Sequence, residues 1–378
     1  MDKDVEELLS RGVTEIIGKE NLLSQIGYGA KLRVKLGIDP TSPDLHLGRS
    51  VPLLKMRDFQ KLGHQAVLIV GDFTGVIGDT SDKESERPML DKSVIEENKK
   101  NYFEQIGKII DLDKAELRYN SEWLEPLTYR EIGEHADQFS VADFTARENI
   151  KRRLEAGKRV SLREMLYPLM QGYDSVAVEA DVELGGVDQR FNLLAGRTLQ
   201  EHFGKPPQSI VMTTFPIIGL DGRKMSSSWG NTINFNTLPG DMYGKVMSIV
   251  DDQIMSYFEL CTRVPMSEIE EIGELVQTNP KEAKMRLAFE ITKLYHGEEE
   301  AKIAQENFVE TFAKGGIPKD IKTVSAGKET PLVEILMAEG LVSSKTEFNR
   351  LNKEGAIEEK ENGVYRVGNH RFLRIERE

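Results

Sequence analysis

Residues 32–70 read LRVKLGIDPTSPDLHLGRSVPLLKMRDFQKLGHQAVLIV and carry the pattern of a strand, a helix and a second strand. Over 32–38, apolar and polar residues alternate, which is the period of a β-strand with one buried face. Two prolines then break the strand, a helix is predicted to begin near Leu47, and the apolar run 66–70 is typical of a buried parallel strand. A strand, a helix and a strand in this order make a right-handed βαβ unit. The sequence therefore predicts an α/β fold built on a doubly wound, Rossmann-like parallel sheet.

Periodicity predicts the rest of the chain in the same way. The predicted strands are 117–119, 176–182 and 210–214, and the predicted helices are two short ones within 5–23, then 92–110, 139–172 and one ending at His202. After residue 236 the pattern is helical, and 315–327 is the predicted linker. The last 48 residues mix two helices with short β-like runs. We therefore expect three domains, at 1–235, 236–320 and 330–378.

The composition limits the class of protein. The chain has 378 residues, of which 39% are hydrophobic and 30% charged, and this is typical of an ordinary globular protein of two or three domains. A single cysteine, Cys261, excludes a disulfide framework and a Cys-rich zinc site, and the histidines lack metal spacing, so we expect no protein-held metal. We find neither a signal peptide nor an apolar run long enough to span a membrane, and we expect a cytoplasmic protein.

The net charge of −13 argues mildly against a nucleic-acid partner, because phosphate binding depends on lysine and arginine. The last 48 residues are close to balanced in charge, so nearly all of the acidic excess lies upstream of them. A local basic face is therefore compatible with the acidic total.

The turn before the first predicted helix contains Leu45-His46-Leu47-Gly48-Arg49. A helix that begins after a strand presents free backbone N–H groups and the positive end of its dipole, which favour a phosphate. His46 and the hydroxyl group of Thr41 are candidate donors to phosphate oxygens, and Gly48 lets a flat ligand approach the backbone closely. Taken alone, this turn is equally compatible with an ordinary helix start.

A second candidate is the loop 222–230, which reads GRKMSSSWG. Glycines bound this loop, the serines favour neither strand nor helix, and Arg223 and Lys224 make it positive. A mobile loop of this composition can close over a polyphosphate. A hairpin turn with solvated charges is the alternative, which the segment Asp221 to Lys224 favours when it is taken alone.

Tyr167, Gln171 and Asp174 are spaced at i, i+4 and i+7, so they share one face of one predicted helix. Their neighbours are apolar, and this face is therefore not a simple solvated stripe. A structural role and a ligand-binding role are equally compatible with these residues alone.

The two loops, in this order, resemble the two signatures of the class I aminoacyl-tRNA synthetases, and the sequence between them is similar to that of the tyrosyl-tRNA synthetases. The resemblance implies that ATP is a substrate. It assigns the reacting triphosphate to Thr41, His46, Arg49 and Lys224. It assigns further ATP contacts to Asp39, Gly48 and Asp188, the last of which holds the ribose.

The same resemblance implies a tyrosine pocket. Asp174 accepts a hydrogen bond from the substrate phenol, whereas Tyr167, Gln171 and Asp79 face the α-amino group. Gln189, in the segment 186–189, lines the pocket for the amino acid.

Two positions depart from the family pattern. Arg49 stands where the first signature ends in histidine or asparagine, and arginine still donates to phosphate but through a longer side chain. Ser227 stands where the second signature often carries another lysine. Arg223, Lys83 and Arg87 are candidates to supply the missing charge to ATP.

A third departure is Lys35, at the strand position where many members carry a tyrosine that contacts the substrate phenol. Strand parity places Lys35 on the same face as Asp39. Lys35 is therefore predicted either to pair with that carboxylate or to point into the pocket.

The last 48 residues resemble the small RNA-binding module shared by a ribosomal small-subunit protein and pseudouridine synthases. Lys345, Arg350 and Lys353 lie near one face of a predicted helix, as contacts to RNA phosphates require. A charged, solvated helix is the alternative.

The chain is thus identified as a member of the tyrosyl-tRNA synthetases. The resemblance implies that it joins tyrosine to ATP, releases pyrophosphate and transfers the tyrosyl group to tRNA(Tyr). It also implies that Mg²⁺ accompanies ATP, that the middle domain binds the anticodon, and that the protein is a homodimer. Two alternatives stay open: a tryptophanyl enzyme of the same architecture, and a non-enzymatic RNA-binding relative, which Arg49 and Ser227 favour.

Overall fold

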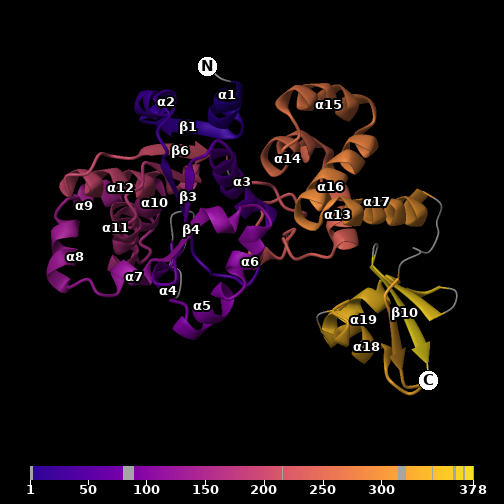
Figure 1. The fold of residues 1–378 in the computed structure, drawn as a ribbon. Coiled ribbons are helices and arrows are strands. Elements are labelled where there is room, and N and C mark those ends of the chain that lie inside the picture. Colours follow the sequence, from indigo (N-terminus) through magenta and orange to yellow (C-terminus); the bar gives the residue numbers. More distant parts are fainter. Residues whose placement is uncertain are drawn as a thin grey trace. The chain divides into compact units, whose positions relative to one another are not determined.

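The computed structural model describes residues 3–79, 89–214, 216–313, 321–342, 344–360, 363–368 and 371–377 (Figure 1). The chain forms two compact units: the first is Met1–Asn236 with Asp252–Glu274, and the second is Thr237–Asp251 with Leu275–Glu378. The predicted boundary at residue 235 puts 252–274 in the helical domain, whereas in the structure this segment belongs to the first unit.

The first unit is built on a six-stranded sheet of order β1-β6-β5-β2-β3-β4. The strands are β1 (Val13–Ile17), β2 (Arg33–Ile38), β3 (Gln65–Val70), β4 (Ala115–Tyr119), β5 (Val182–Gly186) and β6 (Ser209–Thr213). Neighbours from β6 through β5, β2 and β3 to β4 are parallel, as predicted, but β1 pairs antiparallel with β6. The sheet is therefore mixed, with an antiparallel strand at one edge.

One predicted helix and one predicted strand of this unit have wrong boundaries. The sequence predicts a helix over 16–23, and α2 (Lys19–Gly27) confirms it for 19–23. Residues 16 and 17 belong instead to β1, whose β-branched residues extend along the sheet edge, and Gly18 separates β1 from α2 with a left-handed φ of 75°. The sequence also predicts a strand over 176–182. In the structure α11 (Leu162–Ala177) includes the first two residues of that range, and β5 begins only at its last residue.

Helices flank the sheet and position the loops at its carboxyl edge (Figure 1). The described helices of this unit are α1 (Lys3–Ser10), α2, α3 (Leu47–Lys61), α4 (Thr74–Ile77), α5 (Lys92–Lys99), α6 (Tyr102–Gly107), α7 (Ser121–Leu124), α8 (Tyr129–Ala136), α9 (Val141–Thr145), α10 (Glu148–Glu155), α11, α12 (Arg190–His202) and α14 (Ile254–Cys261). The predicted helix 92–110 is thus divided into α5 and α6, and the predicted helix 139–172 into α9, α10 and α11. The prediction of a helix ending at His202 is confirmed.

A buried arginine attaches the returning segment to the start of the chain. The guanidinium group of Arg11 donates hydrogen bonds of 2.8–3.0 Å to the carbonyl oxygens of Phe258, Glu259, Thr262 and Val264, at the end of α14. The first two of these carbonyls belong to the last turn of α14, which leaves its C=O groups unpaired within the helix, and the other two lie just beyond its end. Nearby, Arg263 forms a two-pronged ion pair with Asp58 of α3, with both distances 2.8 Å.

The second unit contains a helical part and a small α+β part. Helices α13 (Pro239–Met247), α16 (Pro280–His296) and α17 (Glu298–Ala313) pack together, and the ring of Tyr243 lies 5.3 Å from that of Phe308. Helix α15 (Met266–Thr278) lies across the division between the two units.

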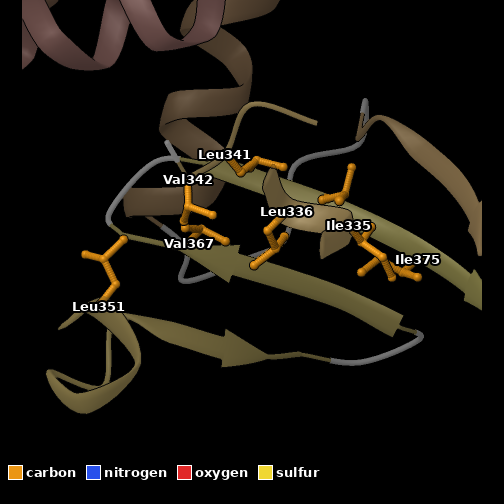
Figure 2. Packing of buried hydrophobic residues seen from close by; sticks show 8 residues of the cluster. Ile335, Leu336, Leu341, Val342, Leu351, Val367 and Ile375 are labelled. Atoms are coloured by element: carbon orange, nitrogen blue, oxygen red, sulfur yellow. The ribbon is translucent and has the colours of Figure 1, made fainter. Parts of the chain in front are cut away.

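The α+β part has two helices on a four-stranded sheet of order β7-β10-β9-β8. Its elements are β7 (Thr323–Ala326), α18 (Leu332–Ala338), α19 (Lys345–Lys353), β8 (Ile357–Glu359), β9 (Val364–Val367) and β10 (Arg371–Arg377). Leu336, Val342 and Ile375 are among the apolar side chains that fill its core (Figure 2). The predicted linker 315–327 is wrong where β7 pairs in parallel with β10, and its first part lies outside the described residues.

Within the described part of the chain, every helix is too short or too polar to span a bilayer.

Candidate active site

A cavity of about 690 Å³ lies at the carboxyl ends of β2 and β5 in the first unit. It brings together segments that are far apart in the sequence. The predicted site residues that line it are Asp39, Thr41, His46, Arg49, Asp79, Tyr167, Gln171, Asp188, Gln189, Lys224 and Ser227. The cavity has the polar groups of both candidate loops and of the α11 face in one space.

The first loop is held by a short segment that follows the second loop. The N–H group of Leu47 donates to the carbonyl oxygen of Ile233 at 3.0 Å, and the N–H group of Phe235 donates to that of Leu45 at 2.9 Å. Backbone pairing of this kind fixes the start of α3 against the segment that carries the lysine loop. The two loops are therefore parts of one structure rather than independent turns.

His46 is the N-cap of α3, and its Nδ1 accepts a hydrogen bond from the N–H group of Gly48 at 3.2 Å. Burial, together with the positive charges of Arg49 and Lys224, lowers the pKa of His46 to about 3. The ring is therefore neutral near pH 7. Because Nδ1 accepts, the proton is on Nε2, which is the donor that a phosphate oxygen requires.

Gly48 serves the imidazole rather than the ligand directly. It does not line the cavity, and a Cβ atom at this position would approach Cε1 of His46 to 2.9 Å and Nδ1 to 3.0 Å. A side chain here would displace the ring. The absence of a side chain at Gly48 therefore places His46.

The lysine loop is organised by Asn231, which is only 4% exposed. Its amide nitrogen donates to the carboxylate of Asp221 at 2.6 Å and to the carbonyl oxygen of Lys224 at 3.0 Å, and its amide oxygen accepts from the N–H group of Ser226 at 2.8 Å. Sequence reasoning missed Asn231, although it lies directly after the glycine that ends the loop.

Arg223 has different surroundings from its neighbour Lys224, which lines the cavity. It is absent from the cavity wall, forms an ion pair with Asp221, and stacks its guanidinium group 4.6 Å from the centre of the Trp229 ring. Lys83 and Arg87, the other candidates for the missing charge, lie outside the described residues.

Asp39 and Tyr167 both line the cavity and contact each other. The hydroxyl group of Tyr167 donates to Asp39 at 2.9 Å, and Thr74 of α4 donates to the other oxygen of Asp39 at 2.7 Å. Burial raises the pKa of Asp39 to about 6, against the effect of these two hydrogen bonds. Beside them, Gln189 donates to Asp79 at 2.7 Å. The wall therefore carries carboxylate oxygens that suit a cationic group.

Asp174 is 3% exposed and does not line the cavity, although it shares the α11 face with Tyr167 and Gln171. The indole N–H group of Trp123 donates to it at 2.8 Å and the amide of Asn120 at 3.4 Å. Burial raises the pKa of Asp174 to about 7.

Sequence reasoning also missed Trp123 and Asn120. Both follow β4, so they stand at the same carboxyl edge of the sheet as the other loops. That position was a usable signal, because ligand crevices form at this edge.

Lys35 does not pair with Asp39, and its side chain does not line the cavity. Its ammonium group is fully buried and donates hydrogen bonds of 2.8 Å to Glu183, to the hydroxyl group of Ser175 and to the carbonyl oxygen of Gln171. An ammonium group has three N–H donors, and all three are used. The predicted pairing with Asp39 is therefore wrong, and Lys35 has no donor left for a phenol.

In the second unit, Lys345, Arg350 and Lys353 are exposed on α19. Arg350 is also within 3.4 Å of Glu354, one helical turn further on. These side chains share one side of α19, opposite the side on which Leu351 enters the core.

The family model described as tRNA synthetases class I (W and Y) matches residues 28–313. The fold is that of a class I synthetase, with a mixed α/β sheet and helices. Among relatives, the tyrosine–tRNA ligase of Thermotoga maritima is 46% identical over 387 residues, which cover 98% of this chain and 96% of that protein. Tyrosine–tRNA ligase 2 of Vibrio parahaemolyticus is 41% identical over 383 residues, which cover 97% of each. The chain belongs to the tyrosine–tRNA ligase family.

Solved structures have the same fold. The C-terminally truncated mitochondrial tyrosyl-tRNA synthetase of Aspergillus nidulans has a TM-score of 0.68 at 24% identity, with 82% of this chain and 94% of that chain covered. The tyrosyl-tRNA synthetase of Archaeoglobus fulgidus, complexed with L-tyrosine, has a TM-score of 0.62 at 22% identity, with 80% and 99% covered. The predicted α/β class is confirmed by this likeness.

Proposed function

We propose that this chain activates tyrosine with ATP, releasing pyrophosphate, and then transfers the tyrosyl group to the 3′ end of tRNA(Tyr). The observation that carries the proposal is the single cavity lined by His46 and Arg49 of one signature loop, by Lys224 of the other, and by Tyr167 and Gln171 of α11. A triphosphate and an amino acid can occupy such a cavity together.

The phosphate end of the cavity supplies positive charge and N–H donors. The Nε2–H group of neutral His46, the guanidinium group of Arg49 and the ammonium group of Lys224 would stabilise negative charge as pyrophosphate leaves. Thr41 adds a hydroxyl donor. The substrate carboxylate is itself the nucleophile, so the protein needs to position the reactants and to stabilise the developing charge.

The amino-acid end supplies acceptors. Asp79, Tyr167 and Gln171 would hold the α-ammonium group, Gln189 would line the pocket, and Asp188 would hold the ribose of ATP. Asp174 is our proposed acceptor for the phenol. Since Asp174 lies behind the cavity wall, the pocket must extend past Gln171 when tyrosine enters.

Mg²⁺ would enter with ATP. Among the described residues there is no group of three or more His, Cys, Asp or Glu side chains that could hold a metal ion. Mg²⁺ commonly retains several waters and is bound largely by substrate phosphates, which suits a site without a protein cage. The ion would neutralise part of the triphosphate charge.

Binding of tRNA would involve the second unit. We infer that the helical part reads the anticodon and that Lys345, Arg350 and Lys353 contact RNA phosphates. The chain would act in the cytoplasm.

A homodimer is part of the proposal. The apolar side chains of Tyr129, Val141 and Leu162 are 94%, 79% and 83% exposed at the starts of α8, α9 and α11. A contiguous apolar patch marks a protein–protein interface, and we infer that these three side chains contribute to one.

The test is exchange of radiolabelled pyrophosphate into ATP, measured with each of the twenty amino acids in turn. Tyrosine should support exchange and phenylalanine and tryptophan should not. Exchange with tryptophan alone would favour the tryptophanyl alternative. No exchange with any amino acid would refute the enzyme and leave the RNA-binding alternative.

A further inference from the structure

A closed group of polar side chains lies directly behind the cavity wall. Lys35 on β2 and Glu183 on β5 are neighbours in register across the sheet, and both are at most 1% exposed. Ser175 donates to Glu183 at 3.1 Å, and Gln208 donates to the same carboxylate oxygen. This group contacts the cavity wall through one side chain, that of Gln171, whose amide nitrogen donates to Glu183 at 3.2 Å.

The carboxylate of Glu183 determines how the Gln171 amide is turned. An ionised carboxylate accepts hydrogen bonds and cannot donate one, so the amide must turn its NH₂ group toward Glu183 and its oxygen away. The bond from Lys35 to the carbonyl oxygen of Gln171 fixes the backbone at the same residue. Both ends of Gln171 are therefore held from behind the wall.

The geometry points to Glu183, anchored by Lys35, as the positioning residue that presents the amide oxygen of Gln171 to the α-ammonium group of the substrate. This inference rests on the proposed function, because it takes an amino acid as the ligand. An ammonium group has only donors, so an amide turned the other way would oppose its NH₂ group to the substrate NH₃⁺. The buried pair would thus select for the amine of the substrate and would have no direct contact with the phenol.

Two double variants of the full chain separate this role from a structural one. Lys35→Met/Glu183→Leu removes the charges and the acceptor, whereas Lys35→Met/Glu183→Gln removes the charges and keeps an acceptor oxygen facing Gln171. A neutral replacement of a buried ion pair generally preserves folding better than loss of one partner. Both double variants lose the charge of Lys35 near Asp174. Any effect of that loss on tyrosine binding is therefore the same in the two variants and cancels when they are compared.

The measurement is the equilibrium dissociation constant for L-tyrosine and for 3-(4-hydroxyphenyl)propanoate, which lacks the amine. In the leucine double, tyrosine binding should weaken by roughly tenfold to hundredfold, as for loss of a hydrogen bond to a charged group. Binding of the analogue should be unchanged, and the glutamine double should recover most of the tyrosine affinity. Ser175→Ala, which removes a hydrogen bond from the other oxygen of Glu183, should leave the ratio of the two affinities unchanged.

Equal weakening of both ligands, or a glutamine double as weak as the leucine double, would overturn the inference. If the leucine double does not fold, Glu183→Asp keeps the charge pair and withdraws the carboxylate from Gln171. This variant should also weaken tyrosine selectively, and an unchanged affinity ratio would overturn the inference. Wild-type protein that binds tyrosine but does not exchange pyrophosphate would refute the proposed function, while these binding ratios would still test the role of Glu183.

Discussion

The substitution Asp174→Asn should stabilise the folded chain, and the gain should depend on pH. Asp174 is 3% exposed, and burial raises its pKa from 3.8 to about 7 in spite of hydrogen bonds from Trp123 and Asn120. A shift of this size corresponds to about 4 kcal/mol of unfavourable free energy for the ionised carboxylate in the folded protein.

The sign follows from proton binding. Between pH 4 and 7 the folded state holds a proton on Asp174 that the unfolded state has lost, so this group makes stability fall as pH rises through that window. Asparagine cannot ionise. The variant should therefore be more stable than wild type by up to about 4 kcal/mol at pH 8, and the two should converge toward pH 4.

The assay is urea unfolding of wild type and Asp174→Asn at pH 4, 6 and 8. Asp221 provides a control of opposite sign, because the hydrogen bond from Asn231 is the main cause that lowers its pKa to about 2. Its contribution is present above about pH 4 and is lost as pH falls, so Asp221→Asn should destabilise at pH 8. A gain in Asp174→Asn that is the same at pH 4 and pH 8 would show that burial of charge is not its cause.

Three further predictions concern the reaction and the tail. Lys224→Ala should lower the rate of pyrophosphate exchange about 100-fold, as for loss of one transition-state donor. Arg223→Ala should change this rate little, because Arg223 is held by Asp221 and Trp229. Equal losses in the two variants would contradict the separate roles. The ring of His46 is neutral, because burial lowers its pKa to about 3. The exchange rates of wild type and of His46→Asn should therefore have parallel pH profiles from pH 5.5 to 8. A fall in the exchange rate toward low pH that is present only in wild type would refute this. Removal of residues 321–378 deletes β7 together with its partner strand β10. The truncated protein should still activate tyrosine but should transfer it to tRNA more weakly. Loss of both steps would show that the tail supports the fold.

The sequence predicts correctly those helices and strands whose structure depends mainly on their own residues. The alternation in β2, the apolar run of β3 and the helix between them need no distant partner to be recognised. The edge strand β1 does, because its short, half-exposed sequence becomes a strand only by pairing with β6, almost 200 residues later. The predicted helix over 16–23 wrongly included the last two residues of β1 for that reason.

The same division holds for the site. The residues of the two loops and of the α11 face form motifs within short segments, and most of them do line one cavity. The environment of Lys35 could not be predicted, because its partner Glu183 is 148 residues away and becomes a neighbour only through the pairing of β2 with β5. Asn231 and Trp123 have no motif of their own, and their roles follow from hydrogen bonds that only the folded chain shows.

Because Asp252–Glu274 returns to the first unit, a single cut in the chain cannot separate the two units. The polypeptide passes between the two units three times, after Asn236, Asp251 and Glu274, so no single proteolytic nick divides it into those units. A nick after Asn236 leaves Arg11 on one fragment and the α14 carbonyls that it binds on the other. Nicked protein should therefore stay associated without denaturant, and two separately produced fragments divided at this point should reassemble as a split protein.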